Sequence, residues 1–194
     1  METTNYSRIY RIIHWAIAVT FVLLLITIFL RLTWMNKFNM ADIIQEYLKG
    51  TDQTLTYDEI VLMAKQIRKP MWNWHINMGY VLVGLFSIRF ILPLFGRMKF
   101  QNPLAKNLSL KVRFQKWTYI IFYICVVGSL VTGLLIEWGP KDWKKPLEEV
   151  HVLGIYYLVA FIVIHVSGVL IAEFSNQKGI ISRIVSGKKD DDGL

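Results

Sequence analysis

The sequence has little of the chemistry that soluble redox and nucleotide-binding proteins use. Cysteine occurs only once, at Cys125, so the chain has no internal disulfide, no cysteine cluster for zinc or iron–sulfur, and no C-x-x-C-H motif for attaching a cofactor covalently. It also lacks G-x-G-x-x-G and P-loop motifs, which argues against a flavin, nicotinamide or nucleotide site. Any redox cofactor must therefore be held without covalent bonds.

Charge is almost absent from four long stretches, at about 11–30, 71–95, 117–137 and 150–172. Each has the roughly 20 apolar residues that cross a bilayer core of about 30 Å, and the 54% apolar content is excessive for a soluble domain. The first stretch is longer than a signal-peptide core and no small-x-small site follows it, so we expect it to remain as a helix. The sequence predicts an all-α membrane protein.

The predicted architecture is a bundle of four transmembrane helices within residues 1–175, with an outer loop at 31–70 and a cytoplasmic tail at 176–194. Lys and Arg are retained on the cytoplasmic side. With both termini inside, the inner segments hold twelve of them, whereas the outer loops hold nine together with nine acids. We therefore interpret the net charge of +8 as a topology signal, not as a nucleic-acid-binding surface.

Histidine occurs only four times, always in these apolar stretches and never in the third. Fourteen residues at about 1.5 Å each separate His151 from His165 by roughly 21 Å along a helix. The alternating helix directions then pair His14 with His165 near the inner surface, and His75 with His151 near the outer surface. Ionisable residues inside a bilayer are costly, and we read them as functional.

A pair of imidazoles on facing helices is the axial ligand set of a haem. One metal ion with bonds near about 2 Å cannot bridge two pairs about 21 Å apart, so a single four-histidine site is excluded. We predict two non-covalent haem b groups, the inner iron held by His14 and His165 and the outer iron by His75 and His151. The alternative is four unrelated histidines, each hydrogen-bonded to a neighbouring helix.

Small residues lie about one turn beyond each predicted ligand, where a porphyrin edge can lie against backbone. These residues are Ala18, Gly79, Gly154 and Gly168. Close helix packing is the alternative explanation for them. Arg89, fourteen residues after His75, is predicted at the depth of the inner haem, where it would pair with a propionate. Snorkelling to the cytoplasmic headgroups is the competing interpretation, and the same two interpretations apply to Arg11.

The motifs "RIIHWAIA" at 11–18 and "HINMG" at 75–79, with the His151 and His165 pair, resemble the bacterial and nickel-hydrogenase type of cytochrome b561. They are also similar to the di-haem subunits of membrane formate dehydrogenases. The resemblance covers essentially the whole chain. It implies a multi-pass protein of the bacterial inner membrane, with two bis-histidine haems paired as above, that exchanges electrons with quinone in a respiratory chain.

Three function classes remain open from the sequence. The first is an electron-transfer subunit that links the quinone pool to a hydrogenase or another redox protein at the outer face. The second is a stand-alone superoxide:quinone oxidoreductase, which the neutral sum of the outer loops disfavours, although Lys141, Lys144 and Lys145 provide local positive charge. The third is a haem-free transporter or scaffold, for which broken helices and an acidic relay are lacking. We assign no catalytic residue.

The outer loop at 31–70 is longer than in the smallest stand-alone relatives that the resemblance suggests. Within it, Thr56 and Glu59 predict a capping box at the start of a short helix that Pro70 ends. Residues 40–49 form a plausible preceding turn or helix that breaks at Gly50. This loop would cover the outer haem or dock a partner, or simply form a hairpin in water or at the interface. The charged end from Gly187 is expected to be disordered.

Overall fold

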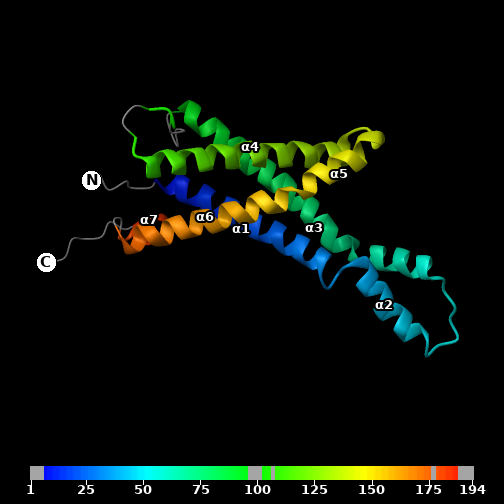
Figure 1. Ribbon diagram of the computed structural model, residues 1–194. Helices are drawn as coiled ribbons and strands as arrows, with labels where there is room; N and C mark the ends of the chain where they lie inside the picture. The colour runs from blue at the N-terminus through cyan, green and yellow to red at the C-terminus, as the bar shows by residue number, and fades with distance from the viewer. Residues whose placement is uncertain (1–6, 96–101, 106–107, 176–177, 188–194) are drawn as a thin grey trace. The chain divides into compact units, whose positions relative to one another are not determined.

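The computed structural model describes residues 7–95, 102–105, 108–175 and 178–187, and the described part is helical with no strand. The elements in Figure 1 are α1 (Arg8–Leu32), α2 (Lys37–Leu48), α3 (Tyr57–Ile91), η1 (Leu92–Phe95), α4 (Leu110–Trp138), η2 (Lys141–Trp143), α5 (Lys144–Val152), α6 (Gly154–Phe174) and α7 (Ile180–Val185). Five of the inner basic residues lie outside the described residues: Arg97, Lys99, Lys106, Lys188 and Lys189.

Four helical segments are long and apolar enough to cross a membrane, which confirms the predicted fold class. They are Arg8–Leu32, Tyr57–Phe95, Leu110–Trp138 and Lys141–Phe174. Only between 6% and 28% of the most apolar window of each is buried inside the protein. Because so much contiguous apolar surface is not tolerated in water, acyl chains must cover it. The cytoplasmic placement of both termini stays a prediction.

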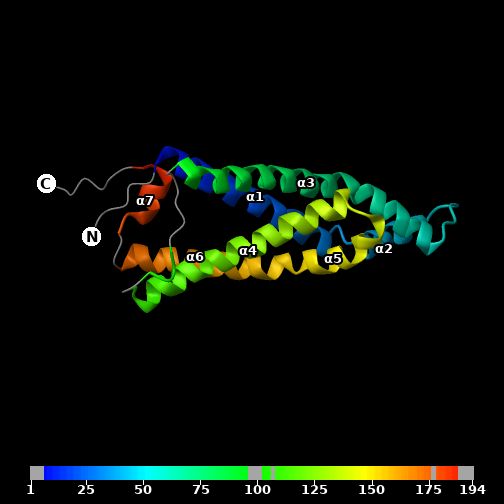
Figure 2. The same cartoon turned by 90° about the horizontal axis from the view of Figure 1, so that it is seen from above.

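The chain forms two compact units. The first unit comprises residues 16–85, and the second comprises the described residues up to Trp15 and from Phe86 onward. In the second unit, α4 and α6 are in contact and run antiparallel, and the short helices η2 and α5 connect them (Figure 1, Figure 2). This short connection allows α6 to pack beside α4.

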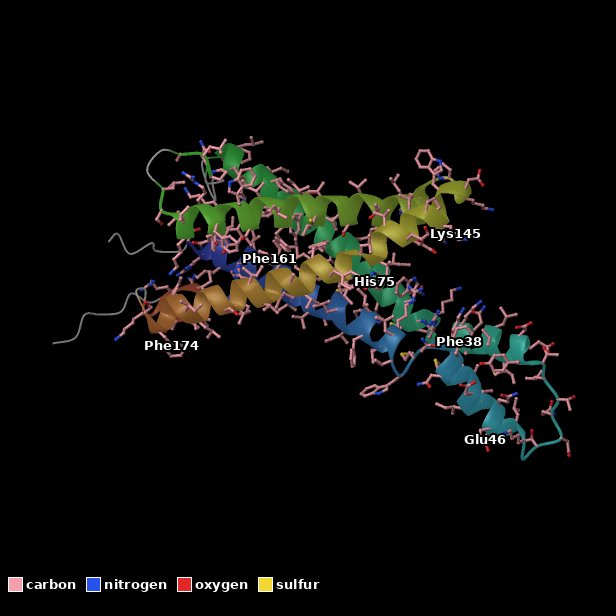
Figure 3. All side chains as sticks on the ribbon, viewed as in Figure 1. Phe38, Glu46, His75, Lys145, Phe161 and Phe174 are labelled. Atoms are coloured by element: carbon pink, nitrogen blue, oxygen red, sulfur yellow. The ribbon has the colours of Figure 1, made fainter. Side chains whose placement is uncertain are left out.

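In the first unit, α2 packs on the first turns of α3 to form a helical hairpin. Its core consists of Ala41, Ile60, Val61 and Ala64, with Met40, Ile44 and Leu48 packed against them. Phe38 and Glu46 mark α2 in Figure 3. The predicted helix near 40–49 is therefore confirmed, and its partner is the start of α3.

The predicted capping box at the start of α3 is also confirmed. The backbone N–H of Thr56 donates to Glu59 Oε2 at 2.8 Å, and the N–H of Glu59 donates to Thr56 Oγ1 at 3.4 Å. Two backbone donors that a helix start leaves without partners are thereby satisfied.

The prediction that Pro70 ends this helix is wrong, because α3 continues from Tyr57 to Ile91 through it. A proline inside a helix removes one backbone hydrogen bond and costs about 3 kcal/mol. Here both sides of the proline are anchored: the turns before it pack on α2, and the turns after it belong to an apolar span. Arg68 Nη1 also donates to the Met35 carbonyl at 3.4 Å, tying the helix to the chain before α2.

The fourth span differs from the predicted single helix at 150–172. It is divided into α5 and α6, with Leu153 between them. The N–H of Leu153 donates to the Val150 carbonyl, and the N–H of Tyr156 to the Leu153 carbonyl, each at 3.1 Å, which is the three-residue spacing of a tighter turn. His151 therefore lies on α5 and His165 on α6, so a continuous helical register does not relate their faces.

The expected tail contains a further short helix, α7, which the sequence did not predict. The Glu173 carboxylate, at the end of α6, accepts from the N–H groups of Gly179 at 2.8 Å and Ile181 at 3.0 Å. At the other end of α7, the Val185 carbonyl accepts from Arg11 Nη1 at 3.3 Å, and the Ile184 carbonyl accepts from the Trp15 indole at 3.2 Å. These bonds hold α7 against the start of α1.

The hairpin core makes a testable prediction. Ile60 is 1% exposed, so Ile60→Ala should destabilise the packing of α2 on α3 by about 2–5 kcal/mol, because it leaves a cavity. Amide hydrogen exchange in residues 37–69 should accelerate accordingly. Leu62→Ala is the matched control, since Leu62 is 57% exposed on the same helix. Equal acceleration in both variants would contradict this core assignment.

Candidate functional site

The structure brings together two of the four histidines, His14 on α1 and His165 on α6. Their ring centroids lie 6.0 Å apart and their planes are inclined by 52°. Two imidazoles that each bind one metal ion through one nitrogen, with bonds near about 2 Å, have centroids about 6 Å apart. The observed separation therefore fits two axial ligands of one iron.

Aromatic side chains contact both histidines of this pair. Tyr10 stacks on His14, with a centroid distance of 6.2 Å, and Trp15 meets its edge at 5.7 Å. Phe161 stacks on His165 at 5.5 Å, and Phe122 of α4 stacks in turn on Phe161 at 3.6 Å; Figure 3 labels Phe161 on α6. Flat apolar walls restrict rotation of the imidazoles and suit a flat apolar macrocycle.

One turn beyond His165, Gly168 faces open space. A Cβ atom added there would meet nothing within 4 Å. The Tyr119 hydroxyl lies 3.3 Å from His165 Nδ1. The Nε2 atom is thus the nitrogen of His165 that this contact leaves for a metal.

His75 lies on α3 in the first unit, within a stack of its own. Trp72, one turn earlier, stacks on its ring at 4.6 Å with planes only 3° apart. The Arg31 guanidinium lies 4.2 Å from the centroid of the Trp72 ring, a cation–π contact. Thr27 Oγ1 lies 2.8 Å from His75 Nδ1, and Gly79, one turn beyond, would tolerate a Cβ with nothing within 4 Å.

His151 lies near the end of α5 and packs against α4. Thr132 Oγ1 is 3.0 Å from its Nδ1 atom. A Cβ added at Gly133 would lie 3.1 Å from Cε1 of the ring, so this glycine makes room for the imidazole. Gly154 is different from Gly79 and Gly168: its added Cβ would meet Ser129 Oγ at 2.9 Å, so it serves the close approach of α6 to α4.

His75 and His151 belong to different units, so their pairing stays a prediction. In the described residues, no group of three or more His, Cys, Asp or Glu side chains is placed to hold a metal ion. A haem iron needs only two protein ligands because the porphyrin supplies four nitrogens. The donor set therefore fits haem: imidazoles with a hydroxyl at Nδ1, aromatic walls, and glycines beside open space.

Arg89 is buried near the end of α3, with 9% of its surface exposed. Its guanidinium carbon lies 5.4 Å from the centroid of the Tyr123 ring on α4. A snorkelling arginine extends its charged end into water. Burial of the Arg89 side chain suits pairing with an interior carboxylate, and the choice between the two interpretations stays a prediction.

Sequence reasoning missed the residues that contact the histidines, which are Thr27, Trp72, Tyr119, Thr132 and Gly133, and also Arg31, which contacts Trp72. The signal available for the threonines was weak. Each is a hydroxyl in an apolar stretch, and such a hydroxyl is readily satisfied by its own helix.

Four helical segments able to span a membrane, three of which carry imidazoles beside aromatic side chains, are typical of helical membrane cytochromes b. The chain belongs to the prokaryotic cytochrome b561 family, whose model matches residues 5–187. Membership implies haem b binding and electron transfer in a prokaryotic membrane, and it confirms the resemblance seen in the sequence. Comparisons with curated proteins and with solved structures gave no match.

The contact between Gly133 and His151 generates a prediction. Gly133→Ala should lower the thermal midpoint in detergent relative to Gly128→Ala, because only the first places a Cβ 3.1 Å from the imidazole. Gly128 lies on the same helix with nothing within 4 Å of an added Cβ, and both variants gain about 1 kcal/mol of helix propensity. A midpoint for Gly133→Ala equal to or above that of Gly128→Ala would contradict the packing described.

Proposed function

We propose that the protein holds two haem b groups and transfers electrons between the quinone pool and a redox partner of a respiratory chain. The observation that supports this best is the approach of His14 to His165, with ring centroids 6.0 Å apart inside aromatic walls. Two imidazoles this close, among apolar helices, would bind one haem iron between them. His75 and His151 would serve the second iron.

When bound, haem supplies a one-electron couple between ferric and ferrous iron. The histidines determine what that couple is used for. His14 and His165 would hold one iron, and His75 and His151 the other, so that each haem would carry electrons without binding dioxygen or a substrate. The side chains therefore hold electron carriers in place, and none acts as an acid, base or nucleophile.

Charged side chains near the ligands support the binding of haem carboxylates. Arg89, buried in the second unit, would pair with a propionate of the inner haem, in line with its depth on α3. Arg31, stacked over Trp72 beside His75, places a second guanidinium in the first unit. Arginine is well suited to this role because its planar fork matches a carboxylate.

Different surfaces of the protein would bind quinone and a protein partner. Quinones dissolve in acyl chains and reach the protein through the exposed apolar faces of its spans. At the predicted outer side, α2 and the segment before it expose Trp34, Ile43 and Tyr47 to 73%, 67% and 77%. Such aromatic and aliphatic side chains favour a docked redox protein, such as a hydrogenase, over a surface facing only water.

A second candidate is a stand-alone superoxide:quinone oxidoreductase. Lys144 and Lys145 are exposed at the start of α5, the same short helix that carries His151. Positive charge next to the predicted outer ligand would attract a small anion.

The haem assignment is tested by pyridine haemochrome analysis of purified protein. We expect two protohaems per chain. His14→Ala and His165→Ala should each abolish one and the same haem, and His75→Ala and His151→Ala the other. Tyr156→Ala, at a position of α6 that is 72% exposed, should retain both. Absence of haem, or losses that pair His75 with His165, would overturn the assignment.

The two candidate functions are separated by supplying superoxide and a quinone analogue to the isolated protein. The electron-transfer subunit should reduce quinone only when a reduced partner or an artificial donor is added. Quinone reduction by superoxide without any partner would instead establish the stand-alone enzyme. This activity should then be lower in the double variant Lys144→Glu, Lys145→Glu.

A further inference from the structure

Two threonines make the same unusual arrangement behind two different histidines. In the first unit, Thr27 is 7% exposed, and its hydroxyl lies 2.6 Å from the Leu24 carbonyl and 2.8 Å from His75 Nδ1. Thr27 is thus placed between a carbonyl of its own helix and an imidazole from another helix.

In the second unit, Thr132 repeats this arrangement on α4. Its hydroxyl lies 2.8 Å from the Gly128 carbonyl, 3.1 Å from the Ser129 carbonyl and 3.0 Å from His151 Nδ1. The two histidines come from different helices, α3 and α5, and the two threonines from α1 and α4. His165, in contrast, contacts a tyrosine hydroxyl through its Nδ1 atom.

Counting protons shows which ring nitrogen carries hydrogen. A hydroxyl group has one proton to donate, and a carbonyl oxygen can only accept. If Nδ1 also lacked a proton, two acceptors would compete for a single hydroxyl proton. If Nδ1 carries the proton, it can donate to the hydroxyl, and the hydroxyl proton remains for a carbonyl of its own helix. At Thr132 the Gly128 and Ser129 carbonyls share that proton, and the Ser129 backbone also hydrogen-bonds His151. Such chains strengthen one another where the surroundings are apolar.

We propose that Thr27 and Thr132 are positioning residues that hold His75 and His151 in the tautomer protonated at Nδ1. This leaves the Nε2 lone pair as the only nitrogen able to bind a metal, and it fixes the rotation of each ring. The inference rests on the proposed function in taking these histidines as haem ligands. Within that function it assigns a role to the two hydroxyl groups that contact the proposed ligands of the outer haem.

The hydroxyl also affects the iron. An imidazole that donates from Nδ1 is a more basic ligand through Nε2, which stabilises ferric over ferrous iron. Loss of such a supporting contact typically weakens metal binding by about 10- to 100-fold. Removing either hydroxyl should therefore loosen one haem and raise the midpoint potential of that haem.

The test uses Thr27→Val and Thr132→Val, which keep the shape of the side chain and remove its hydroxyl. Each variant should release the haem that is missing from His75→Ala or His151→Ala, respectively, at least about tenfold faster to a haem-scavenging apoprotein. The midpoint potential of the same haem should rise, and the other haem should be unchanged. Thr27→Ser and Thr132→Ser retain the hydroxyl and should restore wild-type behaviour.

Matched controls separate this role from simple helix stabilisation. Thr20 is 5% exposed on α1, and its hydroxyl donates to the Ala16 carbonyl at 2.7 Å. Thr118 on α4 donates to the Phe114 carbonyl at 3.0 Å. His75 and His151 are proposed to hold one haem. Thr20→Val and Thr118→Val should therefore not change the midpoint potential of that haem.

Wild-type protein with two haems, together with valine variants that keep haem retention and potentials unchanged, would overturn the inference while leaving the proposed function intact. Equal effects in the Thr20→Val and Thr118→Val controls would overturn it as well. Wild-type protein without haem would instead contradict the proposed function. Nitrogen NMR of histidine-labelled protein then tests the tautomer by itself: we expect protonated Nδ1 at His75 and His151, and protonated Nε2 would contradict it.

Discussion

The structure depends on one constraint: an imidazole placed between apolar helices in a bilayer must have partners for its polar atoms, because water is not there to provide them. The described contacts meet this constraint by the same means at three histidines. A hydroxyl from another helix approaches the Nδ1 atom of His75, His151 and His165. The cytochrome b561 family binds haem b, and these histidines are the ligands that we propose for it.

The aromatic residues add orientation to this pattern. Trp72 stacks on His75 with planes 3° apart, and Phe161 stacks on His165 with planes 11° apart. In both cases the aromatic residue precedes the histidine by about one turn of the same helix. A ring that is stacked on one side and hydrogen-bonded at Nδ1 has little freedom to rotate. The packing of the helices thereby fixes the orientation of these two imidazoles.

The spans and their class were predictable from the sequence because bilayer thickness fixes the length of an apolar helix. The capping box of Thr56 and Glu59 was predictable because all its atoms lie within one turn. Three features were not predictable from the sequence: the continuation of α3 through Pro70, the break at Leu153, and the packing of α7 against the start of α1. Each depends on contacts between distant segments, such as the packing of α2 on α3 or the bonds from Arg11 to the end of α7.

The candidate site shows the same division. Four histidines stand out in apolar stretches because ionisable side chains are rare there, so the sequence identified them directly. Their supporting residues did not stand out. Thr27 is 48 positions from His75, and a membrane-helix threonine already satisfies its proton on its own backbone, so nothing in the sequence demands a further partner.

The central claim is that four imidazoles hold two irons as bis-histidine pairs. Electron paramagnetic resonance of the oxidised, purified protein tests it most directly, because axial ligation determines the spin state of ferric haem. The account predicts two low-spin ferric signals of equal intensity, with one lost in His14→Ala and the other retained. A high-spin ferric signal in the wild-type protein, or a single low-spin signal that survives every histidine substitution, would contradict it.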